Sequence, residues 1–181
     1  MKSKAKPPAR RARLDTTTVV QAAVELIEAE GLEALTLGRL AKDLEVQTPS
    51  LYNHVDGLQG LMRELGAAAM LAVAEAYRAY VKEHYGLYLT GLRSAGLQTP
   101  VDAELQAAQE RVVRIALAVV GSFGLQDKDA LHAVRGLRSI VHGFATLEVA
   151  GGFGLPLDCD ESFRRLIELF TRSLSAGEPA R

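Results

Sequence analysis

The chain has 181 residues, enough for one or two compact domains. Hydrophobic residues make up 48% of it and aromatic residues only 6%, and alanine and leucine recur at helical spacing, so the composition favours an all-α protein over a sheet. The sequence contains no apolar run of about 20 residues and no signal peptide, which excludes a transmembrane span and leads us to expect a cytoplasmic protein. The single cysteine, Cys159, excludes an intramolecular disulfide and a multi-cysteine metal site.

Residues 1–14 carry the most uneven charge in the chain. The net charge is −1, but six basic residues and no acidic residue precede Asp15, which leaves −7 for the remaining 167 residues. We expect a flexible basic arm here. Such a segment is either a solubilising tail or an arm that contacts nucleic-acid phosphates.

The first helix is expected from about Asp15 to Glu30. Asp15 or one of the three following threonines caps its first turn, and Gly31 ends it. Its expected buried face consists of Val20, Ala23, Val24 and Ile27. This helix would brace the two short helices that follow and complete a three-helix head.

Two short helices that meet at a tight turn are expected between Thr36 and Val55. In the first, Thr36 is placed to cap the helix, and Leu40 and Ala41 lie on its buried face. Ala41 is small, which lets the two helices cross closely. The pattern is typical of a helix-turn-helix, whose second helix enters the major groove of DNA, although an ordinary helical hairpin also has it.

The second of these helices, expected over residues 48–55, favours the DNA-reading interpretation. Pro49 lies in its first turn, where a missing N–H costs little, and Leu51 and Val55 form its buried face. Its outward positions can hydrogen-bond to bases or phosphates, and none carries a long solubilising charge. These outward residues are Gln47, Ser50, Asn53 and His54, with Tyr52 beside them.

The run Leu35-Thr36-Leu37, followed by Leu40-Ala41, Val46, Leu51-Tyr52 and His54-Val55, resembles the DNA-binding domain of the TetR family of transcriptional regulators over roughly residues 19–65. Our candidates for phosphate contacts are Thr36, Thr48, Tyr52 and His54, the last two because the resemblance implies them. Our candidates for base contacts are Gln47, Ser50 and Asn53.

Two positions depart from that family pattern. Glu45 stands where the turn usually has glycine, and a positive φ there would cost roughly 1–2 kcal/mol. Leu58 stands where the family usually has a lysine that contacts a DNA phosphate, so one expected contact with the DNA backbone is lost.

After Asp56-Gly57 a long helix is expected, which would act as a lever between the head and the rest of the chain. The tyrosines between residues 77 and 88 either pack in a core or line a ligand pocket, and the sequence leaves both open. The helix expected over residues 101–121 is apolar nearly all round in its middle, which predicts that it is buried. Candidate pocket residues are Tyr85, Tyr88, Leu92, Val113, Leu117 and Phe144.

Two more helices are expected, one capped by Asp127 and one starting at Asp158 with Glu161 in a capping-box spacing. The segment 137–170 resembles the C-terminal domain of a TetR subgroup named for its Trp-His-Gly run, here Val141-His142-Gly143. The resemblance implies a four-helix interface between two copies, and two wide apolar faces agree with it. The expected interface residues are Leu137, Val141, Phe163, Ile167 and Phe170.

No catalytic or metal-binding motif is present, and the four histidines are scattered, so we expect no enzyme, metal site or cofactor. The expected organisation is a basic arm (1–14), a helix-turn-helix head (15–62) and a helical body for ligand binding and dimerisation (63–176). The sequence predicts an all-α, ligand-responsive transcriptional regulator, a repressor that binds a palindromic operator as a homodimer. Its partners would be double-stranded DNA, a second copy and an unknown small-molecule effector, but no membrane. The alternative is a helical small-molecule binder or enzyme with a non-functional head.

Overall fold

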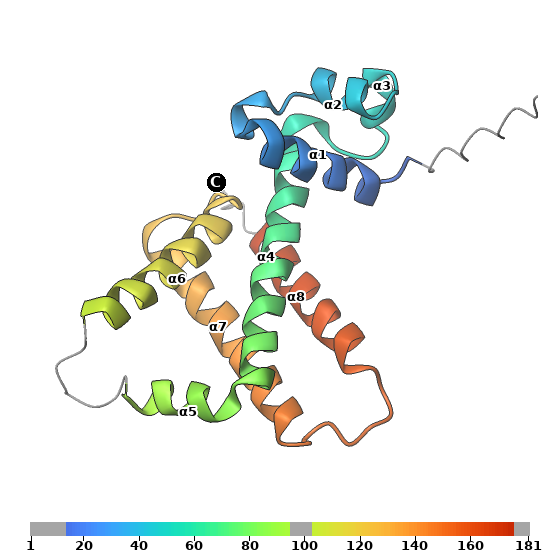
Figure 1. The fold of residues 1–181 in the computed structure, drawn as a ribbon. Coiled ribbons are helices and arrows are strands. Elements are labelled where there is room, and N and C mark those ends of the chain that lie inside the picture. Colours follow the sequence, from blue (N-terminus) through green and yellow to red (C-terminus); the bar gives the residue numbers. More distant parts are fainter. Residues whose placement is uncertain (1–13, 95–102, 176–181) are drawn as a thin grey trace, which may run out of the picture. The chain divides into compact units, whose positions relative to one another are not determined.

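The computed structural model describes residues 14–94 and 103–175, and within them every regular element is a helix (Figure 1). The all-α prediction is therefore confirmed for the described residues. The basic arm expected over residues 1–14 lies outside them except for Leu14. The contacts divide the chain into two units, one up to Leu61 and one from Met62 onward, and each is described by itself.

The first unit contains α1 (Thr16–Glu30), the short 3₁₀ helix η1 (Leu32–Ala34), α2 (Leu37–Asp43), α3 (Thr48–Leu51) and the start of α4 (Gly57–Glu83). Asp15 caps α1, since its carboxylate accepts a hydrogen bond from the Thr18 N–H at 2.8 Å. Gly31 ends the helix with φ +87°, a conformation that glycine adopts without strain. Both ends agree with the sequence-based prediction.

The buried face of α1 is rotated from the expected one. Val19, Ala23 and Leu26 are buried, whereas Val20, Val24 and Ile27 are only half-buried. The core of the first unit also includes Leu35, Leu40, Ala41, Leu51, Val55 and Leu61. The helix, its caps and Ala23 were predicted correctly, but the face was centred about one residue too late.

The second unit contains the rest of α4, α5 (Tyr85–Ser94), α6 (Ala103–Gly121), α7 (Asp127–Val149) and α8 (Cys159–Ser175). Its core joins residues from α4, α6, α7 and α8, and α7 and α8 run alongside α4 in Figure 1. The ten buried members are Met70, Ala74, Val120, Ala130, Ala133, Leu137, Val141, Phe144, Phe163 and Ile167. Gly66 of α4 allows close packing on the end of α6, because a Cβ there would lie 2.3 Å from the Ser122 Oγ.

The expected dimer-interface residues Leu137, Val141, Phe163 and Ile167 belong to the core of the second unit. These side chains are 5% exposed or less within a single copy, because α7 and α8 turn their wide apolar faces toward each other and toward α4. Phe170, the fifth expected residue, is half-buried against the same core. They have almost no surface left for a second copy.

The prediction that the middle of α6 is buried is wrong. Only Ala116 and Val120 of its described side chains are buried, while Val112, Val113 and Ile115 are 60%, 45% and 54% exposed. The start of α7 differs as well. Gln126 occupies the cap position without a side-chain hydrogen bond, and Asp127 lies inside the helix at φ +48°.

Candidate nucleic-acid interface and effector region

The turn between α2 and α3 is fixed by backbone hydrogen bonds. Thr36 caps α2, its hydroxyl accepting from the Arg39 N–H at 3.1 Å. At the other end, the Val46 N–H donates to the Ala41 carbonyl at 2.9 Å, and Glu45 between them has φ +53°. Glu45 thus has the positive φ that we considered because it stands where the turn usually has glycine. It therefore carries backbone strain in the folded head.

The reading helix is shorter than expected. The α-helix covers only Thr48–Leu51, and the chain then continues as a turn in which the His54 and Val55 N–H groups both donate to the Leu51 carbonyl. Gln47 occupies the cap position, and its side chain makes no capping hydrogen bond. The prediction of a helix over the whole of 48–55 is therefore wrong in length, although the backbone stays coiled to Val55.

The candidate contact residues lie around this short helix at the surface. Tyr52 is 60% exposed, Thr36, Gln47 and Asn53 are also exposed, and Thr48, Ser50 and His54 are half-buried. Beneath them Leu51 and Val55 are 0% and 5% exposed. The polar residues are thus available to water, and the two apolar residues hold the segment to the head.

The end of this segment is also joined to α1. The Thr16 hydroxyl donates to the His54 carbonyl at 3.0 Å, across 38 residues of sequence. A Cβ added at Gly57, which has φ +64°, would touch the Tyr52 ring at 3.9 Å. The hydrogen bond from Thr16 therefore ties the backbone at His54 to α1.

The described head is acidic. Residues 14–61 hold eight acidic side chains and two basic ones, Arg39 and Lys42. Arg39 is held by two carboxylates, Glu30 at 2.7 Å and Asp43 at 3.1 Å. Its hydrogen bonds with Asp43 and Glu30 raise the pKa of Arg39 above its ordinary value. The head therefore supplies little cationic attraction for phosphates.

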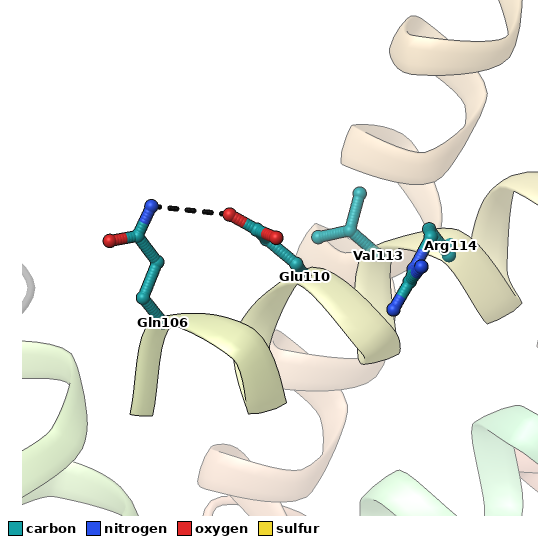
Figure 2. Close-up of a pocket in the computed structure, with 4 residues that line it drawn as sticks. All are labelled: Gln106, Glu110, Val113 and Arg114. Carbon is teal, nitrogen blue, oxygen red and sulfur yellow. Dashed lines mark hydrogen bonds between the residues drawn. The ribbon is translucent and has the colours of Figure 1, made fainter. Parts of the chain in front are cut away.

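Two of the six expected pocket residues line hollows of the second unit, each a different one. An open hollow of about 470 Å³ lies on α6. Figure 2 shows the side chains that line it, which are Gln106, Glu110, Val113 and Arg114. Phe144 lines a different hollow, formed with the loop after α7, and the other four expected residues line neither. Since all four residues of the first hollow come from one helix, it lies on the surface.

Tyr88 instead belongs to a chain of hydrogen bonds across three helices. Its hydroxyl lies 2.7 Å from the Tyr77 hydroxyl of α4 and 2.5 Å from His142 Nδ1 of α7. Burial, together with the bond to Tyr77, raises the pKa of Tyr88 well above its ordinary value, so the hydroxyl stays protonated. Tyr77 and Tyr88 therefore join α4, α5 and α7 through their hydroxyl groups.

A buried ion pair that the sequence did not reveal joins α4 to α7. Arg78 Nε and Nη2 each donate to a Glu148 carboxylate oxygen at 2.7 Å, and the two side chains are only 9% and 13% exposed. Asp160 of α8 lies 2.8 Å from the same guanidinium, whose carbon is 5.4 and 4.9 Å from the ring centres of Phe144 and Phe163. The only signal was an arginine on the apolar stripe of α4, four residues after Ala74.

Neither a membrane span nor a metal cluster occurs in the part of the chain that the structure describes. No helix there combines the length and hydropathy needed to cross a bilayer. No group of three or more histidine, cysteine or acidic side chains is placed there to hold an ion.

Two family models match the chain. Residues 19–65 match the bacterial regulatory proteins of the tetR family, and residues 70–170 match a tetracyclin repressor-like C-terminal domain. The HTH-type transcriptional regulator Rv0681 of Mycobacterium tuberculosis is 33% identical, over 90% of this chain and 82% of that protein. The HTH-type regulator YobS of Bacillus subtilis is 31% identical, over 91% and 94% respectively.

Among solved structures, Mycobacterium smegmatis BioQ matches over 91% of this chain and 99% of its own, at 23% identity and a TM-score of 0.41. That likeness is too loose to add to the assignment. The two family models and the two relatives that match along most of their length carry it instead. The chain belongs to the TetR family of bacterial transcriptional regulators.

Proposed function

We propose that this regulator is a ligand-controlled repressor, which binds a palindromic operator as a homodimer in the cytoplasm. The observation that supports it best is the arrangement around α3. Gln47, Tyr52 and Asn53 are exposed above the buried Leu51 and Val55, on a segment short enough to enter a major groove.

The proposed contacts follow from the chemistry of these side chains. Gln47, Ser50 and Asn53 would read base edges, since amides and hydroxyls both donate and accept. Tyr52, His54, Thr48 and Thr36 would contact phosphates. The Thr36 hydroxyl already accepts from the Arg39 N–H, and its proton remains available for a phosphate oxygen.

The basic arm would supply the electrostatic attraction that the head lacks. Residues 14–61 carry six more acidic than basic side chains, and Arg39 is occupied by Glu30 and Asp43. The six basic residues before Asp15 balance this excess. Replacing them by glutamine should therefore weaken binding to every DNA sequence and flatten the dependence of log K on log salt, by about 0.9 for each phosphate that the arm no longer neutralises.

Homodimerisation is proposed through the outer sides of α7 and α8, because their inner sides form the core. On α8, Leu166 and Phe170 are half-buried and Leu169 is 62% exposed, which leaves apolar surface beside the core. The resemblance to the Trp-His-Gly subgroup supports the same pair of helices. Sedimentation should show a dimer that Leu169→Glu weakens and that Leu87→Glu, at a 66% exposed position of α5, leaves intact.

Control would pass through α4, which is one continuous helix from Gly57 to Glu83. An effector that binds the body better in one position of α4 than in another shifts the populations of the two states. A coupling of about 1–3 kcal/mol between effector and operator is enough for regulation.

Selection of bound sequences from random duplex DNA, at two salt concentrations, tests the proposal. We expect a palindrome with two half-sites. Asn53→Ala should relax the preference at one base pair of each half-site, whereas Tyr52→Phe should weaken all sequences alike. A protein that retains no sequence preference at either salt concentration would overturn the proposed function.

A further inference from the structure

A hollow of about 230 Å³ lies where the loop after α7 meets the start of α8. Apolar groups make up most of its wall. The side chains that line it are Phe144, Phe153, Leu155, Leu157, Cys159 and Ser162, and the backbones of Gly152 and Gly154 complete it. It lies apart from the α6 hollow and from the tyrosine chain, and it shares only Phe144 with the pocket expected from the sequence.

Backbone hydrogen bonds and a contact between two rings hold the wall in place. The Gly152 N–H donates to the Leu147 carbonyl at 2.7 Å, and the Leu157 N–H donates to the Leu155 carbonyl at 2.8 Å. The rings of Phe153 and Phe144 lie 4.7 Å apart between centres. Leu155 and Leu157 are 75% and 69% exposed, so their apolar surface is accessible to a ligand.

The lining chemistry selects an uncharged ligand. Among the described residues, no charged side chain lines the hollow, and the Ser162 hydroxyl already donates to the Asp158 carbonyl at 2.8 Å. A charged group entering it would lose hydration without gaining a partner, which is costly.

The size of the hollow limits the ligand further. Sites for drug-sized molecules have volumes of about 300–1,000 Å³, and an engineered apolar cavity of about 150 Å³ binds benzene. A volume of about 230 Å³ therefore fits a single ring with one or two small substituents.

Two residues of the wall are neighbours of the groups that surround Arg78. Phe144 lines it, and the Phe144 ring centre is 5.4 Å from the guanidinium carbon of Arg78 on α4. Cys159 lines it and precedes Asp160, which holds the same guanidinium. An occupant that moves either wall residue changes the packing around Arg78.

We infer that this hollow binds a small, uncharged, single-ring apolar molecule and that such a molecule is the effector of the regulator. The binding is independent of DNA, whereas the effector role rests on the proposed function.

Protection of Cys159 measures occupancy at the site itself, because it is the only cysteine in the chain and lines the hollow. The full chain is alkylated with iodoacetamide at increasing toluene concentration, up to the solubility limit, and the modified fraction is followed by mass spectrometry. We expect the alkylation rate to fall to a plateau with toluene and to stay constant with benzoate, which has the ring but carries a charge. A rate that toluene leaves unchanged, or that benzoate lowers equally, overturns the site.

A matched pair of variants locates the effect. Phe153→Ala removes one ring from the wall at a 39% exposed position, and toluene protection should then need an about tenfold higher concentration, which is 1.4 kcal/mol. Leu87→Ala removes an exposed apolar side chain of α5 outside the hollow and should change nothing. If toluene protected Cys159 equally in Phe153→Ala and in the wild-type chain, the ligand would bind elsewhere. Equal thermal unfolding midpoints of these two proteins exclude a folding defect as the cause of any difference.

DNA affinity separates the two parts of the inference. Toluene should change the affinity of the full chain for the selected operator, and Phe153→Ala should require more of it. Protection of Cys159 without any change in operator affinity would overturn the effector role and leave the binding site standing. Absence of any operator would instead overturn the proposed function.

Discussion

The Arg78–Glu148 pair offers a sharp test of how the body is held together, through the single substitution Glu148→Gln. Glutamine keeps the shape of the side chain but removes the charge that faces Arg78 and Lys82, both now 2.7 Å from the carboxylate. Among the described residues, Asp160 is then the carboxylate that remains beside Arg78, and its side chain is 83% exposed and therefore screened by water. The buried guanidinium thus loses most of the negative charge that offsets the cost of its desolvation.

The expected loss of stability is about 3 kcal/mol. Breaking a buried ion pair by removing one partner costs about 3–5 kcal/mol, and the remaining Asp160 places this case at the lower end. The free energy of unfolding of a whole domain is only about 5–15 kcal/mol. The urea midpoint, followed by far-UV circular dichroism, should therefore fall clearly. Glu161→Gln is the matched control, because Glu161 pairs with Arg164 and Arg165 at an exposed position of α8 and should shift the midpoint little.

The same pair predicts a pH dependence with a definite sign. The hydrogen bonds from Arg78, helped by Lys82, lower the pKa of Glu148 below its ordinary value of about 4.5. A carboxyl whose pKa is lower in the folded state stabilises the fold above its unfolded pKa, and this contribution is lost as the pH falls through the folded pKa. The difference between wild type and Glu148→Gln should be constant from about pH 7 to pH 5 and shrink below about pH 4. A difference under about 1 kcal/mol at pH 7, or one that persists unchanged into acid, would refute the reasoning.

Two backbone positions give further tests. Glu45→Gly should raise the melting temperature of the head. Relief of the strain at φ +53° exceeds the conformational entropy that glycine adds to the unfolded chain, so the net gain in stability is about 0.5–1 kcal/mol. Glu33→Gly, at a position without positive φ, should lower the melting temperature. Gly66→Ala should destabilise the body by about 1–3 kcal/mol, because its Cβ would lie 2.3 Å from the Ser122 Oγ, whereas Gly91→Ala, with nothing within 4 Å, should stabilise α5 slightly. Equal stability changes for Glu45→Gly and Glu33→Gly, or for Gly66→Ala and Gly91→Ala, would contradict these assignments. Chemical denaturation measures the free energy of unfolding of all four variants.

Local features of the fold followed from the sequence because each depends on neighbouring residues. A hydroxyl or carboxylate ahead of a helix, as at Asp15 and Thr36, bonds an N–H three residues later, and Gly31 can end a helix with positive φ. For Glu45 it was the family resemblance, in which this turn position usually holds glycine, that led us to consider a positive φ, and Glu45 has one. These features need no knowledge of what the helix packs against.

The errors concern which apolar surface meets which. Val141 and Ile115 are similar in sequence context, both on long helices rich in apolar residues, yet they are 2% and 54% exposed. Periodicity gives the direction of an apolar face but not the element that covers it, so the faces expected at a dimer interface turned out to form the core. The Arg78–Glu148 pair joins residues 70 apart and left no spacing that a local pattern could reveal.

The acidity of the head bears on how such a regulator would distinguish its operator. Non-specific affinity for DNA comes almost entirely from cations near phosphates, and residues 14–61 contribute only Arg39 and Lys42, with Arg39 already occupied. If attraction resides in the arm while base contacts reside in Gln47, Ser50 and Asn53, then the two can vary independently. A head that repels phosphates lowers the affinity for all sequences, so only those that also satisfy the base contacts bind stably. Specificity would then come from weak affinity for non-specific DNA as much as from strong base contacts. It should persist at salt concentrations at which the arm still binds phosphates.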